Sequence, residues 1–193
     1  MKNIFYLFFI CITFTVSSQE NDTIKKSIFS KKHELRIDPI KLKIHGRLAI
    51  SYEYFFSKRI SFGISTTFLT DQYKLERYQD NNSLLFINNY QIIPFSRFSF
   101  ALFKRSLFYI EAFSSINGGK QKRIERLNDG QYAYYDIVEK KYTNVAFGGS
   151  FGYKWYFLKA FSLDINAGLG QNIKSETGPI VISRFGLNLG YRF

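Results

Sequence analysis

The sequence predicts an all-β protein: an eight-stranded antiparallel up-and-down transmembrane β-barrel with a polar, side-chain-filled interior. Three observations predict it. Apolar residues recur at every second position along several segments, which is the side-chain period of a strand. The chain holds 22 Phe and 14 Tyr, yet no apolar stretch beyond the N-terminus approaches the ~20 residues of a spanning helix. Short and long connections alternate, as in an up-and-down barrel.

Residues 1–18 predict a signal peptide. Lys2 precedes the apolar run 4–16, and Val16 and Ser18 supply the small-residue pair for cleavage after Ser18. The alternative is a membrane anchor, but the run is shorter than the ~18 residues that span a bilayer. We therefore expect an exported protein.

The mature chain is expected to be one domain, with a polar periplasmic lead-in over 19–32 and the barrel over 33–193. Cys11 is the only cysteine and lies in the leader, so the mature protein would contain neither a disulfide nor a catalytic thiol. Phe9 and Ile10 precede it where a lipidation site has small residues, which does not favour a lipoprotein.

The first predicted strand covers 33–44. Leu35 and Ile37 share one face, but after Pro39 the apolar positions move to the opposite parity, which we interpret as a bulge. A tight outer loop is expected at 46–47.

The other seven predicted strands follow the same alternation. The strand at 91–102 is the least regular, because Ile93 and Phe95 share the inward face with Gln91 and Arg97. The remaining segments are 49–56, 60–69, 107–117, 145–157, 161–173 and 181–193.

The last strand carries the clearest pattern. From Val181 onward alternate residues are apolar or aromatic except Ser183, and the strand closes on Tyr191 and Phe193. Such an ending resembles the assembly signal of Gram-negative outer-membrane β-barrels. The chain is similar to the small eight-stranded group typified by the OmpA membrane domain and OmpX, and to outer-membrane barrel domains of unknown function. The resemblance implies localisation in the cell outer membrane and recognition of this strand by the barrel assembly machinery.

The predicted inward face collects charged side chains. An eight-stranded barrel is only wide enough for its own side chains, so we expect a polar network of paired charges in the interior. Its predicted members are Arg36, Asp38, Glu53, Arg97, Glu111, Lys154, Asp164, Arg184 and Arg192. Glu53, Glu111 and Asp164 are expected to pair with some of the basic residues. The alternative is a narrow pore for ions or small solutes.

Aromatic residues lie at the ends of strands that run towards the periplasmic side. They predict an aromatic girdle at that membrane interface. Its predicted members are Tyr54, Phe56, Phe98, Phe100, Trp155, Phe157, Tyr191 and Phe193.

Two long connections, 70–90 and 118–144, predict extracellular hairpins. In the second, Asn128, Asp129 and Gly130 form a turn signal between β-competent arms. In the first, a turn is expected near 80–83. An exposed strand edge there could bind an extracellular protein or another surface ligand, although the hairpins could also have no ligand.

The net charge is +12, and loss of Lys2 with the leader lowers it by one to +11. A basic surface attracts anionic partners, which here are outer-membrane lipid and lipopolysaccharide. Nucleic acid is not expected, since the basic residues are dispersed and form no binding motif.

The sequence does not predict an enzyme. Its two histidines are His33 and His45, and no motif places a serine beside either one. No paired histidines or Gly-rich phosphate loop occur, so no metal or cofactor is expected. We therefore expect a structural or adhesive barrel. The alternatives are a lipid-A-modifying enzyme that uses His45, the pore, and a soluble periplasmic barrel of lipocalin type with an apolar pocket.

Overall fold

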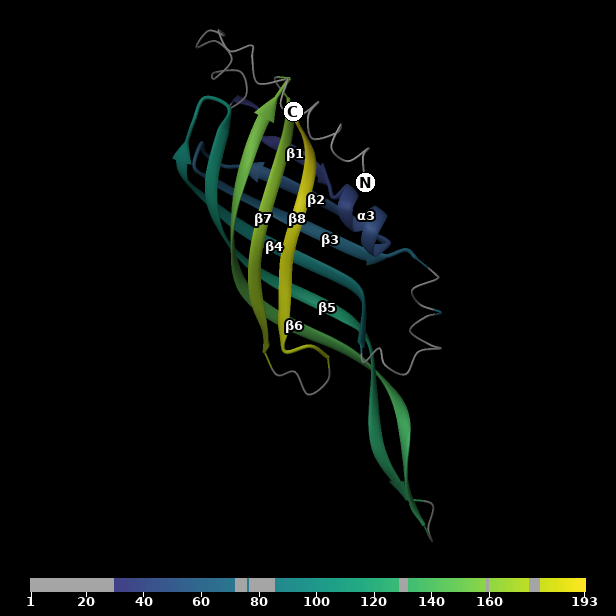
Figure 1. Ribbon diagram of the computed structural model, residues 1–193. Coiled ribbons are helices and arrows are strands. Elements are labelled where there is room, and N and C mark those ends of the chain that lie inside the picture. Colours follow the sequence, from purple (N-terminus) through teal and green to yellow (C-terminus); the bar gives the residue numbers. More distant parts are fainter. Residues whose placement is uncertain (1–29, 72–75, 77–85, 129–131, 159, 174–177) are drawn as a thin grey trace, which may run out of the picture.

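The computed structural model describes residues 30–71, 76, 86–128, 132–158, 160–173 and 178–193. They form a closed antiparallel barrel in which each strand pairs with the next and β1 pairs with β8 (Figure 1). The predicted signal peptide and most of the lead-in lie outside the described residues. The elements are β1 (His33–Ile37), α3 (Pro39–His45), β2 (Arg47–Phe55), β3 (Ile60–Leu69), β4 (Phe86–Leu102), β5 (Ser106–Asn128), β6 (Ala133–Phe157), β7 (Phe161–Ile173) and β8 (Val181–Arg192).

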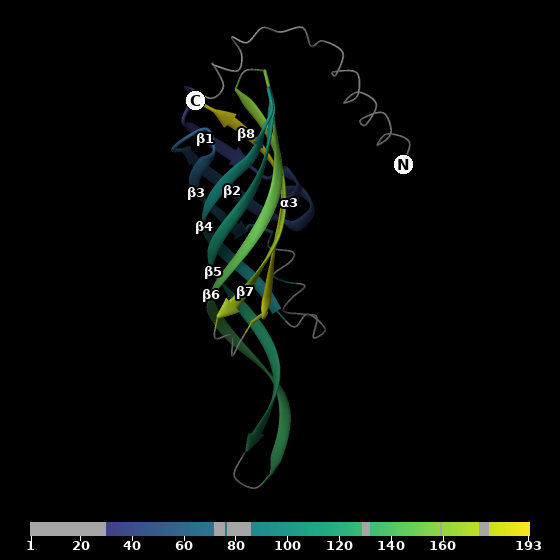
Figure 2. The same ribbon diagram turned by 90° about the vertical axis from the view of Figure 1, so that its left-hand side faces the viewer.

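The two ends of the barrel differ. One end carries the short connections β2–β3, β4–β5 and β6–β7 together with the C-terminus, and we call it the turn end. From the opposite end, the hairpin end, β5 and β6 continue as a paired ribbon well past the other strands (Figures 1 and 2). The arms predicted on either side of residues 128–130 are therefore present, while 129–131 lie outside the described residues.

The predicted hairpin at 70–90 is described only in part. Residues 86–89 form the start of β4, where Phe86 pairs with Gln121 of β5. Its predicted turn near 80–83 lies outside the described residues.

The predicted first strand is wrong in its second half. β1 ends at Ile37, and Pro39 begins the helix α3. The side chain of Asp38 caps this helix by accepting a hydrogen bond of 2.9 Å from the backbone N–H of Lys41. Pro39 suits the first helical position, because its φ is already helical and its missing N–H is not needed there. The parity change that we interpreted as a bulge is thus the start of a helix.

The expected loop at 46–47 is also wrong. Gly46 ends α3 with φ 56°, a left-handed conformation that glycine adopts without steric cost, and Arg47 already belongs to β2.

The strand faces follow the predicted alternation. Outward residues are exposed and apolar, as Phe151 at 68% and Phe185 at 58% show. Inward residues are mostly polar and buried, among them Glu111 at 3% and Arg184 at 5%. This arrangement is the reverse of a water-soluble barrel of lipocalin type, and it suits hydrocarbon outside. In the described part of the chain, no helix is long and apolar enough to cross a bilayer.

Because the exterior of the barrel is apolar, the stability cost of an added surface charge should depend on whether its position faces the lipid. Ile165, near the middle of β7, and Ile124, on the ribbon, are both exposed, at 48% and 74%. We expect Ile165→Arg to lower the free energy of unfolding in lipid vesicles by about 2 to 4 kcal/mol, the cost of arginine at the bilayer midplane. Ile124→Arg is the matched control and should change it little. Urea unfolding measures both, and equal effects would contradict a lipid-covered β7.

Candidate functional site

The interior of the barrel holds a cluster of buried charged side chains. Each of the predicted network residues is buried, with at most 5% of its surface exposed. They come from β1, the cap of α3, and β2, β4, β5, β6, β7 and β8, so the closed sheet itself brings them together. Their arrangement has three parts along the barrel axis.

The central part joins two acids to two arginines. Arg97 Nη1 lies 3.0 Å from Glu53 Oε2 and 2.8 Å from Asp164 Oδ2. Arg36 Nη1 lies 3.0 Å from the same Glu53 oxygen and also contacts Asp164. The hydroxyl of Tyr109 donates a 2.6 Å hydrogen bond to Asp164 Oδ1. Each charge therefore has partners of opposite sign, which burial in a medium of low polarity demands.

Towards the hairpin end, Glu111 holds a second group. Its Oε2 accepts from Arg97 Nε at 2.7 Å and from Arg184 Nη2 at 3.1 Å. Its Oε1 accepts from Ser150 Oγ at 2.8 Å and from Arg184 Nε. Arg97 contacts Glu53 and Asp164 of the central part and also Glu111, so the two parts form one connected network.

Towards the turn end, Lys154 bridges two acids. Its Nζ lies 2.8 Å from Glu34 Oε1 and 2.8 Å from Glu53 Oε2. The sequence reasoning missed Glu34, although it has the same inward parity as Arg36 and is fully buried. Two-residue alternation counted back from Arg36 would have found it.

Two predicted members have other partners. Arg192 donates to the carbonyl of Lys31 and to the hydroxyl of Tyr156, both at 2.8 Å, and its guanidinium lies 3.6 Å from the centre of the Phe55 ring. Asp38 serves α3 as its cap, and its Oδ2 lies 3.6 Å from Lys41 Nζ.

Aromatic rings fill the space that the charges leave. The guanidinium of Arg97 lies 4.2 Å from the ring centre of Tyr109 and 4.6 Å from that of Phe95. Gly152 makes room for Tyr109, since a Cβ there would come within 2.4 Å of the tyrosine ring. Towards the hairpin end, a buried apolar cluster comprises Ile93, Phe95, Phe113, Ala146 and Ile182. This packing leaves the narrow-pore alternative without structural support.

The predicted aromatic girdle residues lie at the turn end, on the outward face or in the adjoining turn. A chain of ring contacts runs from Trp155 through Phe157, Phe161 and Tyr191 to Phe193, with centroid separations of 5.3–6.2 Å. Tyr54 and Phe193 both contact the ring of His33. Phe56, Phe98 and Phe100 are exposed. Phe161 and Phe108 were not predicted as members, because they begin strands that run away from this end.

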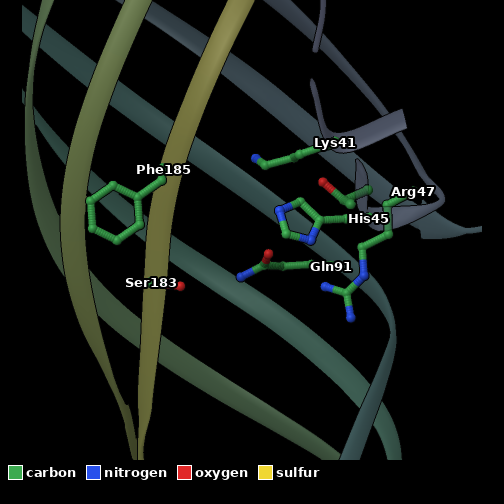
Figure 3. Close-up of a pocket in the computed structure, with 7 residues that line it drawn as sticks. Lys41, His45, Arg47, Gln91, Ser183 and Phe185 are labelled. Atoms are coloured by element: carbon green, nitrogen blue, oxygen red, sulfur yellow. The ribbon is translucent and has the colours of Figure 1, made fainter. Parts of the chain in front are cut away.

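A second polar site lies beside α3. A cavity of about 320 Å³ is lined by Lys41, His45, Arg47, Thr67, Gln91, Ser183 and Phe185 (Figure 3). No sequence motif places a serine near His45, yet Ser183 lines the same cavity. The two residues approach only because β8 runs past α3. In the described part of the chain, no hydrogen bond joins their side chains.

The network predicts a specific cost for removing its acid. Glu111→Ala would leave Arg97 and Arg184 buried with fewer partners, so we expect a loss of about 3 to 5 kcal/mol in the free energy of unfolding. Glu111→Gln keeps an oxygen that accepts from Arg184 and should cost less. The urea midpoint and the temperature at which the folded band disappears on a denaturing gel measure both. Unchanged heat resistance in Glu111→Ala would contradict the network.

Comparison with known proteins gives a fold. No family model matches the chain, and no curated protein matches it. Among solved structures, the chain is similar to the N-terminal β-barrel domain of Pseudomonas aeruginosa OprF, with TM-score 0.50, 13% identity, and 84% of this chain and 98% of that chain covered. It is also similar to Neisserial surface protein A, with TM-score 0.50, 14% identity, and 84% and 95% covered. The closed order of eight antiparallel strands agrees with these neighbours. This chain thus has the fold of the small eight-stranded outer-membrane β-barrels.

Proposed function

We propose that this chain is an integral outer-membrane protein with a structural or adhesive role, and that it contacts its partner through the β5–β6 ribbon. The observation that carries the proposal is the combination of a filled interior with a strand pair that projects beyond the barrel. The ion network and the aromatic rings occupy the axis, which favours action at the surface over passage through the centre.

The ribbon supports this role by its open edges. Within the described residues, β4 pairs with β5 only as far as Gln121, and β7 pairs with β6 only from Val145. Over 123–128 and 133–141 the two arms pair with each other along one edge, and within the described residues no other strand pairs along their second edge. A free edge offers unpaired backbone N–H and C=O groups to an extended partner strand.

The side chains of the ribbon support it too. On one face, Ile124 lies opposite Ile137, and Arg126 lies opposite Tyr135. Ile124 and Tyr135 are 74% and 73% exposed, so their side chains contribute little packing to the ribbon itself. Exposed aromatic residues mixed with arginine are typical of protein-binding surfaces.

The remaining features of the proposal concern export and insertion. Residues 1–18 serve as a signal peptide, 19–32 as a periplasmic lead-in and 33–193 as the barrel. The apolar alternation along β8, which Phe193 follows, supports recognition by the barrel assembly machinery. The apolar outer face, the girdle and the basic net charge support contact with outer-membrane lipid and lipopolysaccharide.

Shortening the ribbon tests the adhesive role. Lys122 and Glu139 pair directly, so residues 123–138 can be replaced by Asn-Gly, the preferred two-residue hairpin turn. We expect cells that carry the shortened protein to lose adhesion to epithelial monolayers and to each other, while the barrel keeps its heat-modifiable migration. Tyr135→Ser combined with Ile124→Ser should give an intermediate loss. Adhesion equal to that of the unaltered protein would contradict the proposal.

The enzymatic alternative has its own test. His45 shares a cavity with Ser183, but catalysis would require a hydrogen bond that activates the serine. We therefore expect lipid A from cells with the protein, with His45→Ala and with no protein to give the same mass spectrum. A mass change that His45→Ala abolishes would favour the lipid-A-modifying enzyme.

A further inference from the structure

The barrel wall has a gap in its backbone pairing. β1 pairs with β2 only as far as Ile37 opposite Ile50, and with β8 only as far as Ile37 opposite Leu189. Beyond that point towards the hairpin end, the helix α3 stands between β2 and β8 in place of a strand (Figure 1). A helix forms its own backbone hydrogen bonds, so no strand ladder joins β2 and β8 along this stretch.

The cavity beside α3 passes through this gap. Thr67 and Gln91 belong to the inward faces of β3 and β4, whereas Ser183 and Phe185 belong to the outward face of β8. One cavity touches residues of both kinds, which a continuous wall would keep apart. It therefore connects the outer half of the barrel interior with the lipid-facing side.

The polar lining of the cavity favours an anion. Lys41 and His45 are one helical turn apart on α3, and both side chains point towards the space between α3 and β8 (Figure 3). Arg47 adds a guanidinium from β2, and Gln91, Thr67 and Ser183 add hydrogen-bonding groups. The nearby acids are Asp38, which caps α3 and whose Oδ2 lies 3.6 Å from Lys41 Nζ, and Asp71, which lies against Gly46. Neither lines the cavity.

The exposed surface beside the cavity is apolar. Ile40 and Ile44 lie one turn apart on α3, next to the face that carries Lys41, and are 40% and 64% exposed. Across the gap, Phe185 of β8 is 58% exposed. A ligand in this place would meet cations at its inner end and hydrocarbon-compatible surface at its outer end.

We propose that this cavity binds the phosphate of a phosphorylated membrane lipid, which enters sideways through the gap from the outer half of the bilayer. Lys41, Arg47 and His45 contact the phosphate oxygens, and Gln91, Thr67 and Ser183 supply further hydrogen bonds. The acyl chains lie outside, against Ile40, Ile44 and Phe185. The cavity does not include residues of the β5–β6 ribbon, so its test does not depend on the outcome for the adhesive role.

Native mass spectrometry of the full barrel, released from a non-ionic detergent, tests the proposal. The probes are dihexanoyl phosphatidic acid, dihexanoyl phosphatidylcholine and inorganic phosphate. We expect one phosphatidic acid per chain, bound at least about tenfold more tightly than either other probe, since only this probe joins an unshielded phosphate to acyl chains. Equal binding of phosphatidylcholine would overturn the cationic site, and equal binding of inorganic phosphate would overturn the lipid.

Variants locate the site. Lys41→Gln and Arg47→Gln each remove one cation from the cavity and should weaken phosphatidic acid binding about tenfold. Lys43→Gln, on the same helix but outside the cavity, is the matched control and should bind as the unaltered protein does. Heat-modifiable migration checks that each variant is folded. If both cavity variants bind like the control, the lipid lies elsewhere and the proposal is wrong.

Discussion

The whole architecture depends on one constraint: in hydrocarbon, every backbone N–H and C=O must find its partner inside the protein. The barrel meets it with a ladder that closes where β1 pairs with β8. The ladders of β1 stop at Ile37, and beyond it the barrel wall is continued by α3, a helix whose backbone hydrogen bonds are internal. The Asp38 cap and the left-handed Gly46 provide hydrogen bonds for backbone groups at the two ends of α3, so this helix can take the place of a strand there.

The closed ladder leads directly to the ion network. Closing eight strands brings inward side chains from opposite walls within contact, and charges in so narrow a space must be paired. Arg97 shows how completely this is done, because it reaches Glu53, Asp164 and Glu111 on three different strands. The network in turn ties the strands together across the axis, where the backbone ladder connects only neighbours.

Two-residue alternation was enough to predict most of this structure. It gave the bounds of β3 and β7 and the faces of the strands, because each side chain of a strand in this setting meets either lipid or the axis. It failed at Asp38 and Pro39, where an alternating apolar pattern continued into a helix and the capping signal was overlooked. It could not pair particular charges either. Which acid meets Arg97 depends on the stagger of the closed sheet, and that is a property of all eight strands together. For the same reason, the sequence pattern could not predict that Ser183 and His45 line one cavity.

The projecting ribbon and the gap beside α3 both lie towards the hairpin end. The turn end carries the short connections and the predicted girdle residues, some of whose rings contact one another. The network lies between the two ends, and Arg184, next to the cavity residues Ser183 and Phe185, is already held by Glu111. A molecule in the gap would therefore meet side chains that are already paired and packed. This arrangement favours binding in the cavity over passage along the axis, as both proposals require.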